Sequence, residues 1–252
     1  MAKYLNYSGL TLDRAANLRR DEAWVAKHLA GADTFILPVW RGRNLVRVHK
    51  NGSRPPEAVF PAGDEARALM AEADVVVILG IDQGTAYVAA DISTLDEDAA
   101  NARAGEDEFE KLRRVGALMA GDQGALLAYA RGMVHWHQRH LFCGVCGEPT
   151  ESRDGGHMRE CANKKNPHTH FPRTDPAVIM LIAHDDPEGR GPACLLGRQT
   201  KWVNGMYSTL AGLSSPAKPW KRPSPARSSR NPPSASPMCS IRRPSRGRFR
   251  RR

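Results

Sequence analysis

Three cysteines between residues 143 and 161 constrain the fold more than any other feature of the sequence. Cys143 and Cys146 have the C-x-x-C spacing of a metal-binding knuckle, and Cys161 follows about fifteen residues later. Thiolates are soft ligands that suit Zn²⁺, and a tetrahedral site needs a fourth donor. A partner cysteine would fall at Asn166, a poor zinc ligand, so we expect His168 to supply the fourth donor.

Two alternatives to this zinc site stay open in the sequence. His170, two residues beyond His168, is a second candidate for the fourth ligand. Alternatively, the knuckle is degenerate and is held by hydrophobic contacts alone. A site with three thiolates still binds metal, but more weakly and with faster exchange. Five cysteines, three of them in one knuckle, fit a reducing compartment better than a disulfide framework.

The positive charge of the chain is concentrated at one end. The formal net charge is +10, yet residues 214–252 hold 12 of the 37 Lys and Arg residues and no Asp or Glu. The rest of the chain is therefore slightly acidic. The same tail has eight prolines, and this composition predicts disorder. Since the sequence shows neither a leader-type apolar segment nor an apolar run of membrane-spanning length, we expect a cytoplasmic protein with no membrane partner.

Periodicity predicts an α+β fold with several parts. Residues 11–30 are expected to form an amphipathic helix, and residues 108–140 are expected to be helical, with His135, His137 and His140 as surface residues near the end of that segment. Runs at 176–184 and 193–199 are nearly all apolar, as in strands covered on both faces. The expected parts are a mixed α/β domain (1–105), connecting helices (106–141), a zinc ribbon (142–173), the start of a catalytic domain (174–213) and a disordered tail (214–252). Within the first part we expect strands at 34–40 and 44–48, a helix at 64–73, and a hairpin of strands 75–82 and 85–92.

Several of these segments together resemble one family. The helix ALLAYARGMVHWHQRHLFCGVCG, the cysteine ribbon, FPRTDPAVIM and GMYSTLAG are similar to the zinc-ribbon NAD(H) diphosphatases of the Nudix hydrolase family. The resemblance spans residues 1 to 212. It implies an N-terminal Nudix-like domain, a ribbon, and a catalytic Nudix domain with an α/β/α sandwich. It also implies cleavage of NADH to AMP and reduced nicotinamide mononucleotide, with NAD-capped RNA as a further substrate.

The motif that carries the family's chemistry is missing from the chain as written. In the family, LAGF leads into the box G-x5-E-x7-R-E-U-x-E-E-x-G-U, where U is apolar, and its glutamates hold the Mg²⁺ or Mn²⁺ that activates water. Here Gly212 is followed by Leu213 and a proline-rich segment without acids, so the box helix cannot form and no catalytic carboxylate can be assigned.

A shift of reading frame accounts for this break. With suitable codons for Leu213 and the residues after it, reading from the third base of codon 213 gives VEPGEAVEEAVAREIFEESA, which is a Nudix box. Codon choice supplies part of this match, but Trp220 followed by Lys221 forces a Glu codon in that frame. The same frame lets residues 243–250 encode SQPWPFP, which resembles the family's specificity segment. We therefore hypothesise a one-base deletion near codon 213; the alternative is a native Pro/Arg/Ser tail.

The resemblance assigns roles to two further residues. Phe171 matches an aromatic that contacts adenine, although a core aromatic is an equal alternative. Ala211 matches the residue whose carbonyl helps to bind the catalytic metal, and a homodimer is implied. The competing function is nucleic-acid binding without sequence preference, in which a zinc ribbon and the basic tail contact phosphates.

Overall fold

The chain, described here in a computed structural model, folds as two units. The structure describes residues 7, 9–31, 33–49, 52, 54–175, 177–185 and 192–213. One unit extends to Pro172 and the other begins at Arg173. The expected disorder of residues 214–252 lies outside the described residues. Within the described residues, no helix combines the length and apolar composition needed to cross a bilayer.

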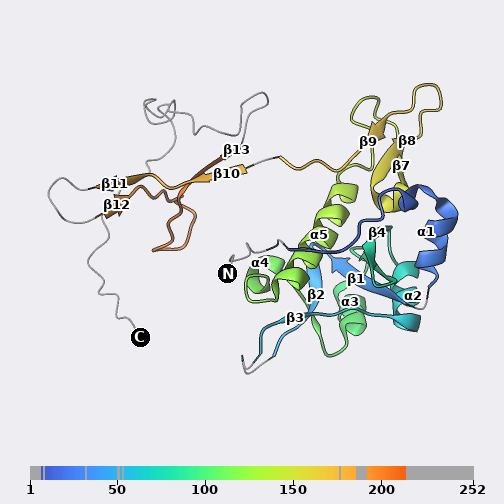
Figure 1. Ribbon diagram of the computed structural model, residues 1–252, viewed down its shortest axis with the longest axis horizontal. Coiled ribbons are helices and arrows are strands. Elements are labelled where there is room, and N and C mark those ends of the chain that lie inside the picture. Colours follow the sequence, from blue (N-terminus) through green and yellow to red (C-terminus); the bar gives the residue numbers. More distant parts are fainter. Residues whose placement is uncertain are drawn as a thin grey trace. The chain divides into compact units, whose positions relative to one another are not determined.

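A mixed six-stranded sheet organises the first unit (Figure 1). Its central strands β1 and β5 are parallel, while β2, β4 and β6 join them through antiparallel pairs. The strands run in the order β3-β2-β1-β5-β4, with β6 attached to β2. Their bounds are β1 (Thr34–Trp40), β2 (Arg43–Arg47), β3 (Glu57–Ala58), β4 (Val75–Asp82), β5 (Thr85–Asp91) and β6 (Glu108–Glu110).

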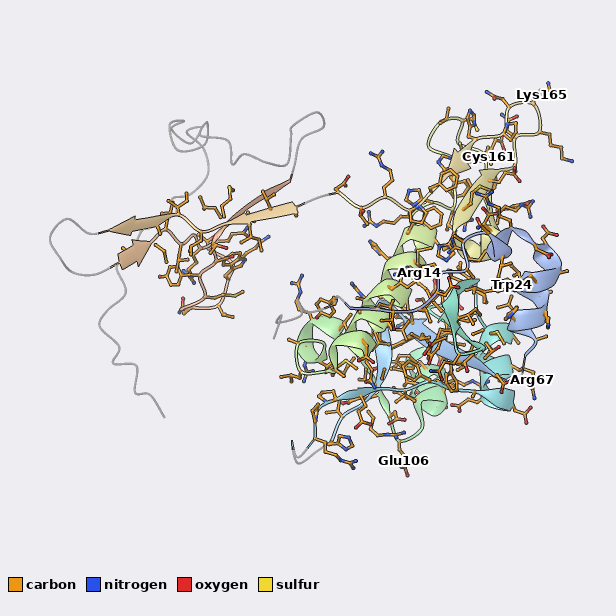
Figure 2. All side chains as sticks on the ribbon, in the orientation of Figure 1. Arg14, Trp24, Arg67, Glu106, Cys161 and Lys165 are labelled. Atoms are coloured by element: carbon orange, nitrogen blue, oxygen red, sulfur yellow. The ribbon has the colours of Figure 1, made fainter. Side chains whose placement is uncertain are left out.

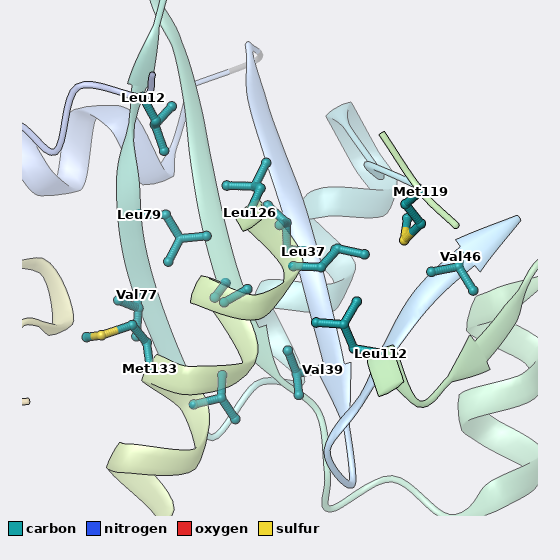
Figure 3. Close-up of a cluster of buried hydrophobic side chains, with 14 of the residues drawn as sticks. Leu12, Leu37, Val39, Val46, Val77, Leu79, Leu112, Met119, Leu126 and Met133 are labelled. Atoms are coloured by element: carbon teal, nitrogen blue, oxygen red, sulfur yellow. The ribbon is translucent and has the colours of Figure 1, made fainter. Parts of the chain in front are cut away.

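Helices cover both faces of this sheet because its strands are apolar on both sides. In β1, Leu37 and Val39 face α5 (Gly121–Gln138), which presents Leu126, Ala130 and other apolar residues at helical spacing. Figure 3 shows this cluster between the sheet and α5. The opposite face of the sheet packs against α2 (Gly63–Ala71) and α3 (Glu97–Ala104), with α1 (Glu22–Leu29) at its margin. The α+β fold is thus confirmed, as are the strands predicted at 34–40 and in the 75–92 hairpin.

The prediction of one helix over residues 11–30 was wrong. Only a short 3-10 turn η1 (Leu18–Arg20) and α1 form there. Ala15 has a φ of 47°, which interrupts an α-helix, and Asp13 instead pairs with Ile81 at the edge of β4. The helix starts after Asp21, whose carboxylate accepts hydrogen bonds from two backbone N–H groups of the first turn.

The prediction of helix from 108 to 140 was also wrong at its start. Residues 108–110 form strand β6, in which the buried Phe109 pairs with Leu45. A short α4 (Leu112–Val115) and then α5 follow. Strand pairing and burial at the sheet therefore override the local helical pattern.

The ribbon completes the first unit, next to α1 and the end of α5 (Figure 1). Its strands β7 (Thr150–Arg153), β8 (Met158–Cys161) and β9 (Thr169–His170) pair as a three-stranded antiparallel sheet. The 3-10 turn η2 (Asp154–Gly156) connects β7 to β8. Glycine is required where η2 meets β4. Gly156 has a φ of 93°, and a Cβ there would lie 2.8 Å from Val77 Cγ2.

The second unit contains two small antiparallel pairs. Strand β10 (Ala177–Met180) pairs with β13 (Leu210–Leu213), and β11 (Ala183–Asp185) pairs with β12 (Pro192–Cys194). The apolar run at 176–184, predicted to be covered on both faces, is open to solvent, since Ile179 is 77% exposed and Leu181 is 66% exposed. The run at 193–199 is exposed at its ends and half-buried at residues 195–198. Each run is also shorter than expected, because the backbone leaves the strand conformation at residues 181–182 and 195–196.

Candidate metal centre

The structure brings Cys143, Cys146, Cys161 and His168 together, as their spacing predicts. Their ligand atoms all lie within 4.8 Å of one another. The first two cysteines belong to the turn after α5, Cys161 ends β8, and His168 immediately precedes β9. The ribbon's own hydrogen bonds hold these segments together: Cys161 N–H donates to the His168 carbonyl at 2.9 Å. Three sulfurs and one imidazole nitrogen at this separation suit a tetrahedral Zn²⁺ site.

The surroundings of Cys143 favour a thiolate. Burial raises the pKa of this thiol. Backbone N–H groups of Cys146 and Val145, together with His170, donate hydrogen bonds that outweigh burial and bring the pKa to about 6. Burial raises the pKa of the Cys161 thiol, and the neighbouring thiols add to this effect. A bound cation would favour the thiolate form at each sulfur, so metal and ligand protonation are linked.

His168, the expected fourth donor, lies beside Asn166, the residue at the position expected for a fourth cysteine. His168 Nδ1 is 3.6 Å from Cys143 Sγ, and its Nε2 is 3.5 Å from the side-chain nitrogen of Asn166. The Asn166 amide thus contacts the outer edge of this ring, where an outer-shell partner can fix its orientation. His170 also approaches the site, with Nε2 at 3.2 Å from Cys143 Sγ. His170 contacts the Cys143 sulfur, whereas a ring nitrogen of His168 lies within 4.8 Å of all three cysteine sulfurs.

A buried polar network joins the ribbon to α5, and this was not foreseen from the sequence. His137, expected on the surface, is 0% exposed, because η2 and β8 cover it. Its Nε2–H donates to the Gly156 carbonyl at 2.7 Å, and its Nδ1 accepts from Arg159 Nη1 at 2.8 Å. The guanidinium also donates to Thr150 Oγ1 and to the Thr150 carbonyl, both at 2.6 Å. The Thr150 hydroxyl in turn donates to the His140 carbonyl, which closes the network.

The two residues with roles implied by the resemblance lie in different units. Phe171 follows β9 in the first unit and is 56% exposed, so it is not a core aromatic there. Ala211 lies on β13 in the second unit, paired with Ile179. The expected position of the Nudix box, residues 214–252, lies outside the described residues.

Comparison with known families matches two consecutive parts of this architecture. A family model described as the NADH pyrophosphatase-like rudimentary NUDIX domain matches residues 33–136, and one described as the NADH pyrophosphatase zinc ribbon domain matches residues 138–171. The chain belongs to the zinc-ribbon NADH pyrophosphatase group of the Nudix family. The first unit therefore consists of the group's rudimentary Nudix domain and its ribbon. The cysteine cluster lies within the matched ribbon, which supports structural zinc at that place.

Similar proteins carry names consistent with this group. The chain is 38% identical over 102 residues to NAD-capped RNA hydrolase NUDT12 of Homo sapiens, which covers 38% of this chain and 21% of that protein. It is 30% identical over 148 residues to NAD(P)H pyrophosphatase NUDT13, mitochondrial, of Mus musculus, covering 56% and 40%. NAD-capped RNA hydrolase NudC of Stutzerimonas stutzeri is 34% identical over 110 residues, covering 44% and 37%. The matched region thus spans 21% to 40% of the length of these relatives.

Proposed function

We propose that this protein descends from a hydrolase that cleaves the pyrophosphate of NAD(H) to AMP and nicotinamide mononucleotide. One observation carries the proposal: the Cys3His ribbon is packed against a rudimentary Nudix domain in one compact unit, and the NADH pyrophosphatase models match both parts. The names of the relatives extend the proposed substrates to NAD-capped RNA. The proposal also includes the cytoplasmic location and the homodimer expected above.

The proposed roles of the residues divide between structure and chemistry. Cys143, Cys146, Cys161 and His168 would hold zinc and thereby fix the two knuckles of the ribbon. Phe171, exposed beside the ribbon, would stack on the adenine. The Ala211 carbonyl would contribute to a Mg²⁺ or Mn²⁺ site, and that cation supplies the activation of water and the stabilisation of phosphate charge.

We also propose that the chain as written does not cleave NADH. Residues 213–252 contain no Asp or Glu, so they offer no carboxylate to hold a divalent cation or to act as a base. A one-base deletion near codon 213 explains why the chain lacks these acids. It also explains why the box and the later SQPWPFP segment can both be read in one shifted frame. The box helix and the strands after it would also cover the apolar residues that β10 exposes.

The test compares three proteins. The first is the chain as written. The second comes from a gene with one base inserted after the second base of codon 213, which gives Leu213→Phe and restores the box VEPGEAVEEAVAREIFEESA. The third is the restored protein with both glutamates of its EES segment replaced by glutamine. Each is incubated with NADH and with Mg²⁺ or Mn²⁺, and AMP is measured by chromatography.

We expect AMP from the restored protein alone. AMP from the chain as written would show that the box does not carry the chemistry. A restored protein that folds and binds zinc but releases no AMP would contradict the proposed activity. Genomic sequence across codon 213 tests the deletion itself, because a stop codon in the shifted frame before SQPWPFP contradicts it.

A further inference from the structure

We propose that the ribbon is a site of oxidative modification, in which a hydroperoxide converts Cys146 and Cys161 into a disulfide and releases the zinc. The inference rests on the proposed zinc ligands and not on NADH hydrolysis. It concerns a reaction of the ribbon thiols themselves, at a place where two sulfurs of unlike accessibility meet.

The contacts of the three sulfurs select the pair. Cys146 Sγ lies 3.3 Å from Cys161 Sγ, and these residues sit on the two different knuckles of the ribbon. Cys146 is exposed, so a small oxidant can reach its sulfur, whereas Cys161 is buried directly behind it. In Figure 2, Cys161 is labelled at the end of the ribbon hairpin, close to the turn that carries Lys165.

Cys143 belongs to the same cluster, but its sulfur also has partners outside the pair. Its sulfur accepts a hydrogen bond from Val145 N–H at 3.4 Å and lies 3.2 Å from His170 Nε2. It is also buried, so an oxidant reaches it less readily than it reaches Cys146. The C-x-x-C pair is nearest in sequence, but the 3.3 Å contact of Cys146 Sγ is with Cys161 Sγ.

With this ligand set, a bound zinc ion would protect the thiols only in part. Asn166 occupies the place of a fourth thiolate, so the site has three sulfurs and one imidazole. Such a site exchanges its metal more readily than one with four thiolates. Zn²⁺ itself undergoes no redox change, so the sulfurs carry all the electrons.

The reaction balances with hydrogen peroxide, the simplest hydroperoxide, as the two-electron oxidant. The Cys146 thiolate attacks one peroxide oxygen, the O–O bond breaks, and a sulfenic acid forms as the first equivalent of water leaves. The Cys161 thiolate then attacks Cys146 Sγ, the S–S bond forms, the S–O bond breaks, and hydroxide leaves as the second water after protonation. Two thiols are oxidised and one hydrogen peroxide is reduced to two waters. A zinc ion held by this cluster would lose two of its four ligands and would be released.

The experiment uses the full chain with Cys194→Ser and Cys239→Ser, so that only the ribbon thiols remain. The zinc-loaded protein is treated with hydrogen peroxide. Released zinc is followed with a chromogenic chelator, free thiols are counted, and linked peptides are mapped by mass spectrometry. We expect zinc release together with the loss of two of the three thiols and a Cys146–Cys161 linkage. Dithiothreitol and added zinc should restore the starting state.

Two further measurements separate this proposal from general thiol oxidation. In guanidinium chloride, short loop closure favours the Cys143–Cys146 linkage, so the preferred pair should change between native and denatured protein. In metal-free protein, Cys143→Ser should keep the Cys146–Cys161 linkage and Cys146→Ser should abolish it. A native Cys143–Cys146 linkage, zinc release with all three thiols intact, or resistance to peroxide would overturn the proposal. None of these results bears on NADH hydrolysis.

Discussion

Arg159 Nη1 lies 2.8 Å from His137 Nδ1, and this buried hydrogen bond joins β8 of the ribbon to α5 of the rudimentary Nudix domain. Arginine is protonated at all ordinary pH values, so the guanidinium donates and the imidazole accepts. The proton of the ring therefore sits on Nε2, which donates to the Gly156 carbonyl. A neutral histidine with both nitrogens occupied is the form that this junction requires.

Replacing the guanidinium should weaken the junction strongly. Arg159→Met leaves His137 Nδ1 and both Thr150 acceptors buried without their donor, and we expect a loss of about 2–4 kcal/mol in the free energy of unfolding. Arg153→Gln on the neighbouring strand is the matched control. Arg153 pairs with Glu151 and Glu160 at a half-exposed position, where ion pairs contribute about 0–1 kcal/mol. Urea unfolding compares the two, and equal losses would contradict the role of the network.

Stability should fall as the pH drops below about 6.5. Burial lowers the pKa of His137 to about 4, and Arg159 nearby adds to the effect, while burial likewise lowers the pKa of His157 to about 4. In the unfolded chain both rings titrate near 6.5, so between pH 6.5 and 4 the unfolded state binds more protons. The stabilisation is complete above pH 6.5 and is lost towards pH 4, by roughly 3 kcal/mol per histidine.

Thermal melting from pH 4 to 8 measures this dependence. His137→Gln should reduce the pH dependence of the melting temperature by about half, because one of the two titrating rings is gone and His157 remains. His135→Gln is the control on the same helix, since His135 is exposed and should leave the slope unchanged. If His137→Gln keeps the full slope, the acid sensitivity arises elsewhere, for example from protonation of the zinc ligands.

The close approach of η2 to β4 should not tolerate a methyl group. In Gly156→Ala the new Cβ would lie 2.9 Å from Val77 Cα, and the φ of 93° is strained for any residue with a side chain. We expect about 3 kcal/mol of destabilisation by urea unfolding. Gly132→Ala in α5 meets nothing within 4 Å and should be neutral or stabilising by up to about 1 kcal/mol. A neutral Gly156→Ala would show that the ribbon does not pack on Val77.

Zinc content should follow the proposed ligands. Purified protein should contain about one zinc or less per chain, measured by plasma emission spectrometry, and chelator should remove it readily. Cys143→Ser and His168→Ala should lower the content, and Asn166→Cys should raise its retention because a thiolate binds zinc more strongly. Cys194→Ser, in the second unit, is the control. Unchanged zinc in Cys143→Ser would refute the site, and loss with His170→Ala but not with His168→Ala would identify the other histidine.

Limited proteolysis should release the first unit. This unit runs through the ribbon to Pro172, and residues 171–175 are all exposed. We expect trypsin to cut after Arg173 and to leave a stable zinc-containing fragment, identified by mass spectrometry. The second unit should be degraded or aggregate, because Ile179 and Leu181 are exposed to solvent. Resistance of the intact chain would contradict this, and Arg173→Gln should slow the cut.

The sequence by itself determined the metal knuckle and the central strands. The C-x-x-C spacing and the later Cys161 are local chemical signals, and the apolar runs of β1, β4 and β5 encode strands buried on both faces. The absence of acidic residues after Gly212 is likewise a property of the sequence alone, and it bears most directly on activity.

Only the tertiary structure decided which polar residues are buried and which local patterns survive. His137 looked like one of several histidines near a helix end, and it is buried because η2 and β8, far along the chain, pack over it. The sequence before α1 has a helical pattern, but Asp13 pairs with Ile81 instead. The sequence before α4 also has a helical pattern, but Phe109 pairs with Leu45 in the sheet. Local periodicity records the propensity of a segment. Burial and strand pairing depend on partners distant in sequence, and their larger free energies determine the result.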